Sequence, residues 1–60
     1  MFDEVGFYVI DSAGNVLTRV DTERQAMLFA TQQNSTTLLC VVDVYGPELD
    51  ALVIAEVGGR

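Results

Sequence analysis

Residues 38–45, Leu-Leu-Cys-Val-Val-Asp-Val-Tyr, predict the best-defined strand of this chain. β-branched and aromatic residues favour extended backbone, and the Gly46-Pro47 pair that follows ends the run. Successive side chains of a strand point to opposite faces of a sheet. The even positions of this strand are all apolar, and the odd positions are apolar except for Asp43. The stretch therefore predicts a sheet with apolar side chains on both faces.

Three further strands are predicted around this one. Val5–Ile10 and Val16–Val20 are rich in β-branched residues, and the turn-forming residues 11–15 between them predict a hairpin. Ala51–Val57 is a fourth strand in which only Glu56 is polar.

A helix is predicted between the second and third strands. Thr22 followed by Gln25 has the spacing of a capping box, with Asp21 as an alternative N-cap, and the helix should end near Gln33. Helical spacing places Leu28 on the outer side and groups four residues on the inner side: Ala26, Met27, Phe29 and Ala30. We expect Phe29 to be the main anchor of the helix in the core.

The element order β-β-α-β-β predicts one small acidic domain, residues 1–60, of the α+β class. A single helix should pack on one face of a mostly antiparallel four-stranded sheet, and the crossover through the helix permits one parallel strand pair. A helix about 10 Å wide cannot cover a sheet about 19 Å across, and it leaves the other face bare.

The uncovered face calls for a second layer. Either twist and loops cover it, or a second copy of the chain or a partner does; a homodimer is the main expectation. If the even positions of residues 38–45 lie under the helix, the expected interface residues are Leu39, Val41, Tyr45, Leu52 and Ile54. A register shifted by one residue would exchange the two sets.

Composition excludes several functions. Three arginines stand against nine carboxylates, which gives a net charge of −6, and the chain has no lysine or histidine. A histidine base, a lysine nucleophile and a His-Cys zinc site are therefore excluded, and so is a basic footprint for nucleic acid. We expect a protein that is not an enzyme, with no catalytic residue, cofactor or metal, and no direct contact with nucleic acid.

Two local features favour structural roles. The Asp11-to-Asn15 segment has some residues of a calcium loop but lacks its ligand spacing and distal glutamate, so we expect a hairpin turn. Cys40 cannot form an intrachain disulfide, and its apolar neighbours predict a buried thiol. Without a signal peptide or a membrane-spanning run, we expect the protein in the cytoplasm and not at a membrane.

The chain resembles small accessory proteins of bacteriophages, which are hairpin–helix–strand miniatures of this length. The resemblance is carried by Tyr8-Val9-Ile10-Asp11, Gly14-Asn15-Val16, Thr18, Thr22, Ala26, Phe29-Ala30 and the run Val41 to Gly46. It implies an inhibitor that binds a host complex, such as RNA polymerase or a CRISPR complex, and it assigns no binding residue.

A second resemblance is to ubiquitin-like and sulfur-carrier proteins, whose chains end in a diglycine. It is carried by the element order and Gly58-Gly59, although Arg60 follows the pair and would have to be removed. The leading hypothesis is thus a non-enzymatic, acidic protein-interaction module that binds a host protein with a basic surface. A sulfur carrier and a purely structural or regulatory homodimer are the alternatives.

Overall fold

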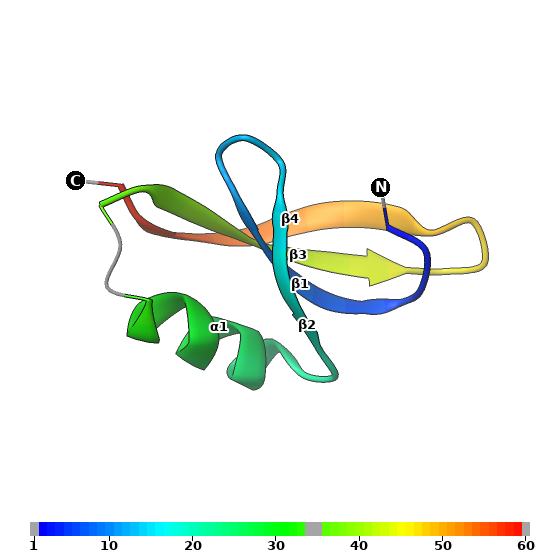
Figure 1. The fold of residues 1–60 in the computed structure, drawn as a ribbon. Coiled ribbons are helices and arrows are strands. Elements are labelled where there is room, and N and C mark those ends of the chain that lie inside the picture. Colours follow the sequence, from blue (N-terminus) through cyan, green and yellow to red (C-terminus); the bar gives the residue numbers. More distant parts are fainter. Residues whose placement is uncertain (1, 34–35, 60) are drawn as a thin grey trace.

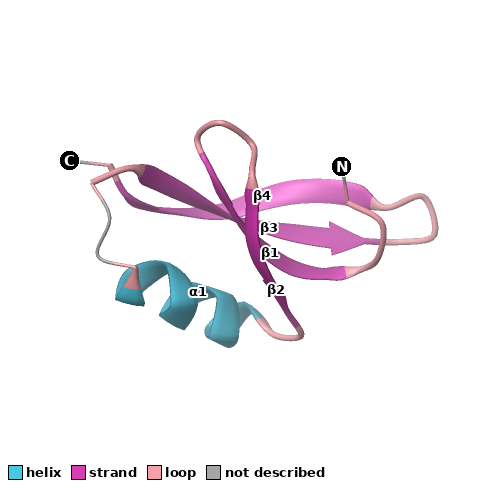
Figure 2. Ribbon diagram, viewed as in Figure 1, coloured by secondary structure: helices cyan, strands magenta, loops and turns pink. Residues whose placement is uncertain are grey.

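The computed structural model describes residues 2–33 and 36–59, which form one sheet and one helix (Figures 1 and 2). The elements are β1 (Gly6–Asp11), β2 (Val16–Val20), α1 (Glu23–Gln32), β3 (Leu38–Tyr45) and β4 (Asp50–Gly58). The predicted α+β class and β-β-α-β-β order are confirmed. β2 and β3 have the predicted bounds, β1 and β4 differ by one residue at each end, and α1 ends one residue before the predicted end.

The sheet has the strand order β2-β1-β3-β4, with every neighbouring pair antiparallel. β2 and β3 run in the same direction because both are antiparallel to β1, which lies between them. The crossover through α1 therefore passes over β1, and the parallel pair that the sequence permitted is absent among the described strands. Figure 2 shows the helix lying on one side of the sheet.

Local capping fixes the start of α1. Thr22 is the N-cap, and its hydroxyl accepts a hydrogen bond from the Gln25 amide at 3.2 Å. Glu23 adds a negative charge near the positive end of the helix dipole. The helix is too short to cross a membrane, and no described helix is long and apolar enough to do so.

The helix packs through its smallest side chains. Ala26 and Ala30 are buried, whereas Phe29 is only half-buried at the margin of the same core. The predicted inner face of the helix is thus confirmed, but its most deeply buried residues are the alanines rather than Phe29. Leu28 lies on the outer side, as predicted, with 49% of its surface exposed.

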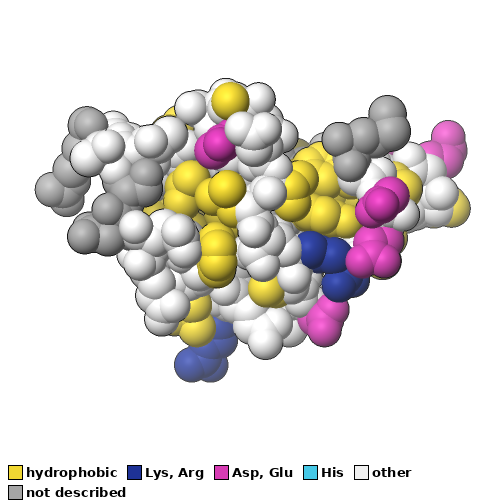
Figure 3. Space-filling view, in the orientation of Figure 1, with side chains coloured by type: hydrophobic (Ala, Val, Ile, Leu, Met, Phe, Trp, Pro, Cys, Tyr) yellow, Lys and Arg dark blue, Asp and Glu magenta, His cyan; other side chains and the backbone are white. Residues whose placement is uncertain are grey.

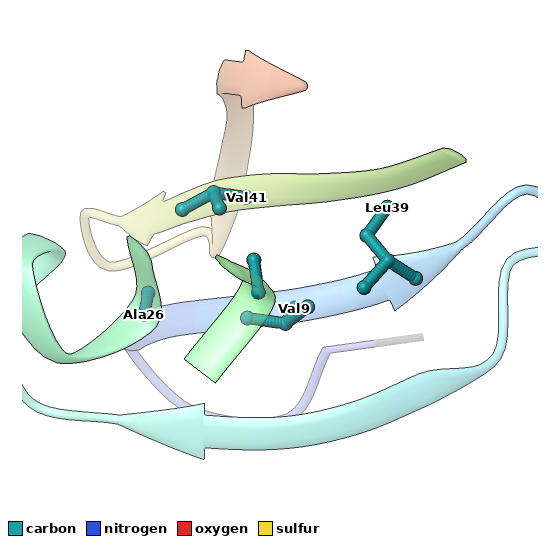
Figure 4. Close-up of a cluster of buried hydrophobic side chains, with 5 residues drawn as sticks. Val9, Ala26, Leu39 and Val41 are labelled. Atoms are coloured by element: carbon teal, nitrogen blue, oxygen red, sulfur yellow. The ribbon is translucent and has the colours of Figure 1, made fainter. Parts of the chain in front are cut away.

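Two hydrophobic clusters lie on opposite faces of the sheet. The helix-side core contains Val9, Ala26, Ala30, Leu39 and Val41, whose side chains fill the space between α1 and the central strands (Figure 4). Val9 and Val41 are cross-strand partners and are fully buried.

The second cluster is built from the other positions of the same two strands. It contains Tyr8, Val42 and Val44, with Phe2 and Leu49 packed against it. We call the side of the sheet that bears this cluster the second face.

The face assignment corrects the expected interface. The odd positions of β3 lie under the helix, so the condition on which that set rested is not met. Leu39 and Val41 are buried beneath α1, and Ile54 packs against the same core. Both sets of positions are apolar, so polarity alone did not distinguish them.

Close packing at Ala26 leads to a stability prediction. Replacing it by leucine (Ala26→Leu) should push α1 away from the sheet and lower the free energy of unfolding by about 1–3 kcal/mol. Leu28→Ala, at an exposed position of the same helix, should change it by less than about 0.5 kcal/mol. Urea unfolding of both variants measures the difference, and equal effects would show that the helix does not pack through its alanines.

Candidate interaction surface

The Asp11-to-Asn15 segment is a hairpin turn held by one carboxylate. Asp11 Oδ1 accepts hydrogen bonds from the Ala13 and Asn15 amides at 3.0 and 2.9 Å, and Oδ2 accepts one from Asn15 Nδ2 at 3.1 Å. The Gly14 amide donates to the Asp11 carbonyl at 3.0 Å, with Gly14 at φ 88°. The predicted turn is confirmed. Among the described residues, no three His, Cys, Asp or Glu side chains are grouped so that they could hold a metal ion.

The N-terminal segment is fastened to the sheet by Arg19. Its Nε lies 3.1 Å from Glu4 Oε1 and donates a hydrogen bond to the Val5 carbonyl at 2.9 Å. Its Nη1 lies 3.4 Å from Asp21 Oδ1. Gly6 has φ 144°, which side-chain-bearing residues rarely adopt, and a Cβ there would lie 2.6 Å from the Arg19 Nε and would displace the arginine from its contacts. We call these contacts the Arg19 clasp.

The clasped segment covers part of the second face. The Phe2 ring packs against Tyr8 with centroids 4.6 Å apart, and the Tyr8 hydroxyl donates to the Glu4 carbonyl at 2.7 Å. Leu49 reaches the same cluster from the β3–β4 turn, in a left-handed conformation with φ 55°. That conformation costs about 1–2 kcal/mol for a residue with a side chain, and partial burial of the leucine opposes this cost. The chain thus supplies its own cover for Tyr8, Val42 and Val44.

Exposed apolar side chains remain where β3 ends and β4 begins. Tyr45 and Leu52, two of the predicted interface residues, are 47% and 56% exposed. Val53, which was not among the expected interface residues, is 50% exposed. Leu52 pairs with Asp43 on the helix-side face, beyond the helix, and Val53 pairs with Val42 on the second face. We call Tyr45, Leu52 and Val53 the apolar tip.

Carboxylates gather at the end of the sheet that bears the apolar tip. At this end of the sheet β1 and β4 begin and β2 and β3 end. Asp and Glu side chains gather there on one side of the view in Figure 3. The acidic residues that the strand order brings to this end are Asp3, Glu4, Asp21, Asp43, Glu48 and Asp50. Of the described arginines, Arg19 is engaged in the clasp and Arg24 lies on the helix.

Cys40 and the glycine pair have local structural settings. Cys40 is half-buried and packs against the second cluster, less enclosed than we predicted. Gly58 pairs with Leu38 in the β3–β4 ladder, and a Cβ on Gly59 would lie 3.1 Å from Leu38 Cβ. Both glycines have positive φ, at 86° and 80°. Backbone conformation thus favours glycine at both positions, and close packing favours it at Gly59.

Comparisons with protein-family models, curated proteins and solved structures found no match to this chain.

The Arg19 clasp predicts a non-additive pair of substitutions. Gly6→Ala should lower the free energy of unfolding by more than about 1 kcal/mol, because the new Cβ meets Arg19 in a backbone conformation that disfavours it. Gly14→Ala is the control, since its φ is also positive but nothing lies within 4 Å. In a double-mutant cycle, Gly6→Ala with Arg19→Ala should cost less than the two single losses combined. Additive losses would exclude the steric contact.

The Asp11 turn predicts a pH-dependent contribution to stability. Hydrogen bonds from the Asn15 backbone amide and then its side chain hold the pKa of Asp11 below its ordinary value of 3.8. A carboxyl group whose pKa is lower in the folded state stabilises the fold above its unfolded pKa, and loses that contribution as pH falls through the folded pKa.

Thermal unfolding of the protein and of Asp11→Ala should therefore differ near neutral pH. The gap in melting temperature should shrink as pH falls below about 3.8. Ser12→Ala, in the same turn, should show a small gap throughout. A gap for Asp11→Ala that persists unchanged in strong acid would contradict the role given to its carboxylate.

Proposed function

We propose that this protein is a non-enzymatic interaction module that binds a basic surface of a larger protein through its apolar tip. The observation that carries the proposal is the position of Tyr45, Leu52 and Val53, which are about half exposed at the carboxylate-rich end of the sheet. Single exposed apolar residues are ordinary, but neighbouring ones that include a tyrosine, such as Tyr45 and Leu52 on one face, are typical of interface cores. Val53 adds exposed apolar surface on the other face of the same strand.

Charge supports a basic partner. A net charge of −6 on a small protein attracts positive surfaces and raises association rates. Arg19 is paired with Glu4 and Asp21, which leaves little positive charge for phosphate contacts and supports a protein partner over nucleic acid.

The resemblance to bacteriophage accessory proteins gives the partner a biological setting. It supports an inhibitor that acts in the cytoplasm of the host on a complex such as RNA polymerase or a CRISPR complex. Such machines present basic channels to nucleic acid, and an acidic module suits them.

A homodimer is the second candidate, favoured by the free edge of β4. The corrected face assignment leaves less area for a sheet-on-sheet dimer, because α1 covers one face and Phe2 and Leu49 cover part of the other. Sedimentation at micromolar concentrations tests this candidate, with a dimer that dissociates on dilution as its expected result.

Affinity capture with matched variants tests the leading proposal. The immobilised protein and Leu28→Ser should capture the same basic protein from host-cell lysate, and Leu52→Ser should lose it. Both substitutions remove one exposed leucine, but Leu28 lies on the outer side of α1. Equal capture by all three would refute the apolar tip as the binding site, and recovery of an adenylating enzyme would favour the sulfur-carrier alternative.

The purified partner then allows a kinetic test of charge steering. Its association rate should fall steeply between low and moderate salt, since the Debye length shortens from about 30 Å at 0.01 M to about 8 Å at 0.15 M. The dissociation rate should change less. An association rate that ignores salt would remove charge steering from the proposal.

A further inference from the structure

The outer edge of β4 offers backbone groups as well as side chains. β4 is the last strand in the order β2-β1-β3-β4, so only one of its edges pairs with a described strand. An open edge presents N–H and C=O groups that another extended segment can bind. β2 is the other edge strand, but it is shorter, and its Arg19 is engaged in the clasp.

A bulge divides β4 into two unlike halves. Val41 pairs with Ala55 whereas Val42 pairs with Val53, so Ile54 is the extra residue. After the bulge, Ala55 and Val57 are half-buried against the helix-side core. Before it, the four residues of Asp50–Val53 are all exposed, and their side chains point alternately to the two faces of the sheet. The open, regular part of the edge is therefore Asp50–Val53.

Charge distinguishes the possible occupants of this half-strand. Asp50 begins it, Glu48 precedes it in the turn, and Asp43 pairs with Leu52. Two β4 strands that pair would bring these carboxylates of both copies to one shared edge, and each copy has a net charge of −6. Like net charges repel each other, whereas a basic segment is attracted to the same carboxylates. The edge therefore suits a basic segment better than a second copy.

We propose that Asp50–Val53 binds a short extended segment of a partner protein by strand addition. Apolar side chains of that segment lie beside Leu52 on one face and Val53 on the other, and a lysine or arginine lies beside Asp50. Backbone hydrogen bonds supply affinity and the side chains supply specificity. The inference rests on the proposed function and specifies the kind of partner that the apolar tip takes.

A peptide titration of the full chain, followed by NMR, tests strand addition. The probe is a short capped peptide with lysine at each end and alternating valine and threonine between. It should shift the amide resonances of Ala51, Leu52 and Val53. Two further peptides carry N-methyl groups on alternate residues, one on the odd-numbered and one on the even-numbered positions of the peptide. Only the one whose N-methyl groups replace the N–H groups that face β4 should lose binding. A peptide with glutamate at each end should bind more weakly than the lysine peptide.

Two isosteric substitutions in β4 provide the matched control. Asp50→Asn should lower the affinity for the lysine peptide about two- to fivefold, the range that an exposed ion pair supplies. Glu56→Gln removes the same charge beyond the bulge and should leave the affinity nearly unchanged.

Three results would overturn the inference. The first is that the lysine peptide shifts resonances only of α1 or of the second face, and the second is that both N-methylated peptides bind as tightly as the parent peptide. The third is that, without any peptide, the β4 resonances shift with protein concentration. The last would assign the edge to a homodimer. If the peptide fails at β4 while Leu52-dependent capture persists, strand addition is wrong and the interaction module stands. If the peptide binds but no Leu52-dependent partner is captured, the proposed function fails independently.

Discussion

The β1–β3 ladder is apolar on both faces, and the rest of the structure depends on that constraint. Val9 and Val41 pair on one face and Tyr8 and Val42 on the other, all four buried. A single sheet can bury both sets only if something covers each side. The chain has one helix, so the two sides are covered by different means.

The helix covers one side at close range because its inner residues are small. Ala26 and Ala30 bring the backbone of α1 near β1 and β3, which favours burial of Val9 and Val41. Phe2 and Leu49 cover the other side from irregular segments. Such segments have few hydrogen bonds of their own. The Arg19 clasp therefore holds the N-terminal segment, which carries Phe2, in place.

Strand and helix positions follow from local signals in the sequence, and for that reason they could be predicted. β-branched runs bounded by turn residues mark β2 and β3, and the pair Thr22 and Gln25 marks the helix start. Which face lies under the helix could not be predicted, because β3 is apolar at both sets of positions. Its one polar residue, Asp43, lies on the helix-side face but beyond the helix, paired with the exposed Leu52.

The candidate surface was predicted only in part, for a related reason. Tyr45 and Leu52 were expected from their apolar character, whereas Val53 is exposed because β4 is an edge strand with a bulge. A bulge depends on the pairing between strands, and no residue type in β4 predicts where it lies. Arg19 likewise had no distinguishing feature in the sequence. Its role in the clasp arises only because the fold places the N-terminal segment, up to Gly6, beside the Arg19 side chain.

The charges on β4 connect stability with recognition. An exposed apolar edge invites association with its own kind, and charged residues on the edge oppose it. Asp50 and Glu56 bracket the apolar run of β4, and the bulge places them on opposite faces of the sheet. The same carboxylates attract a segment of opposite charge. The backbone of β4 could pair with either kind of strand. The charge of the incoming strand therefore decides the pairing: a second acidic copy is repelled, and a basic segment is attracted.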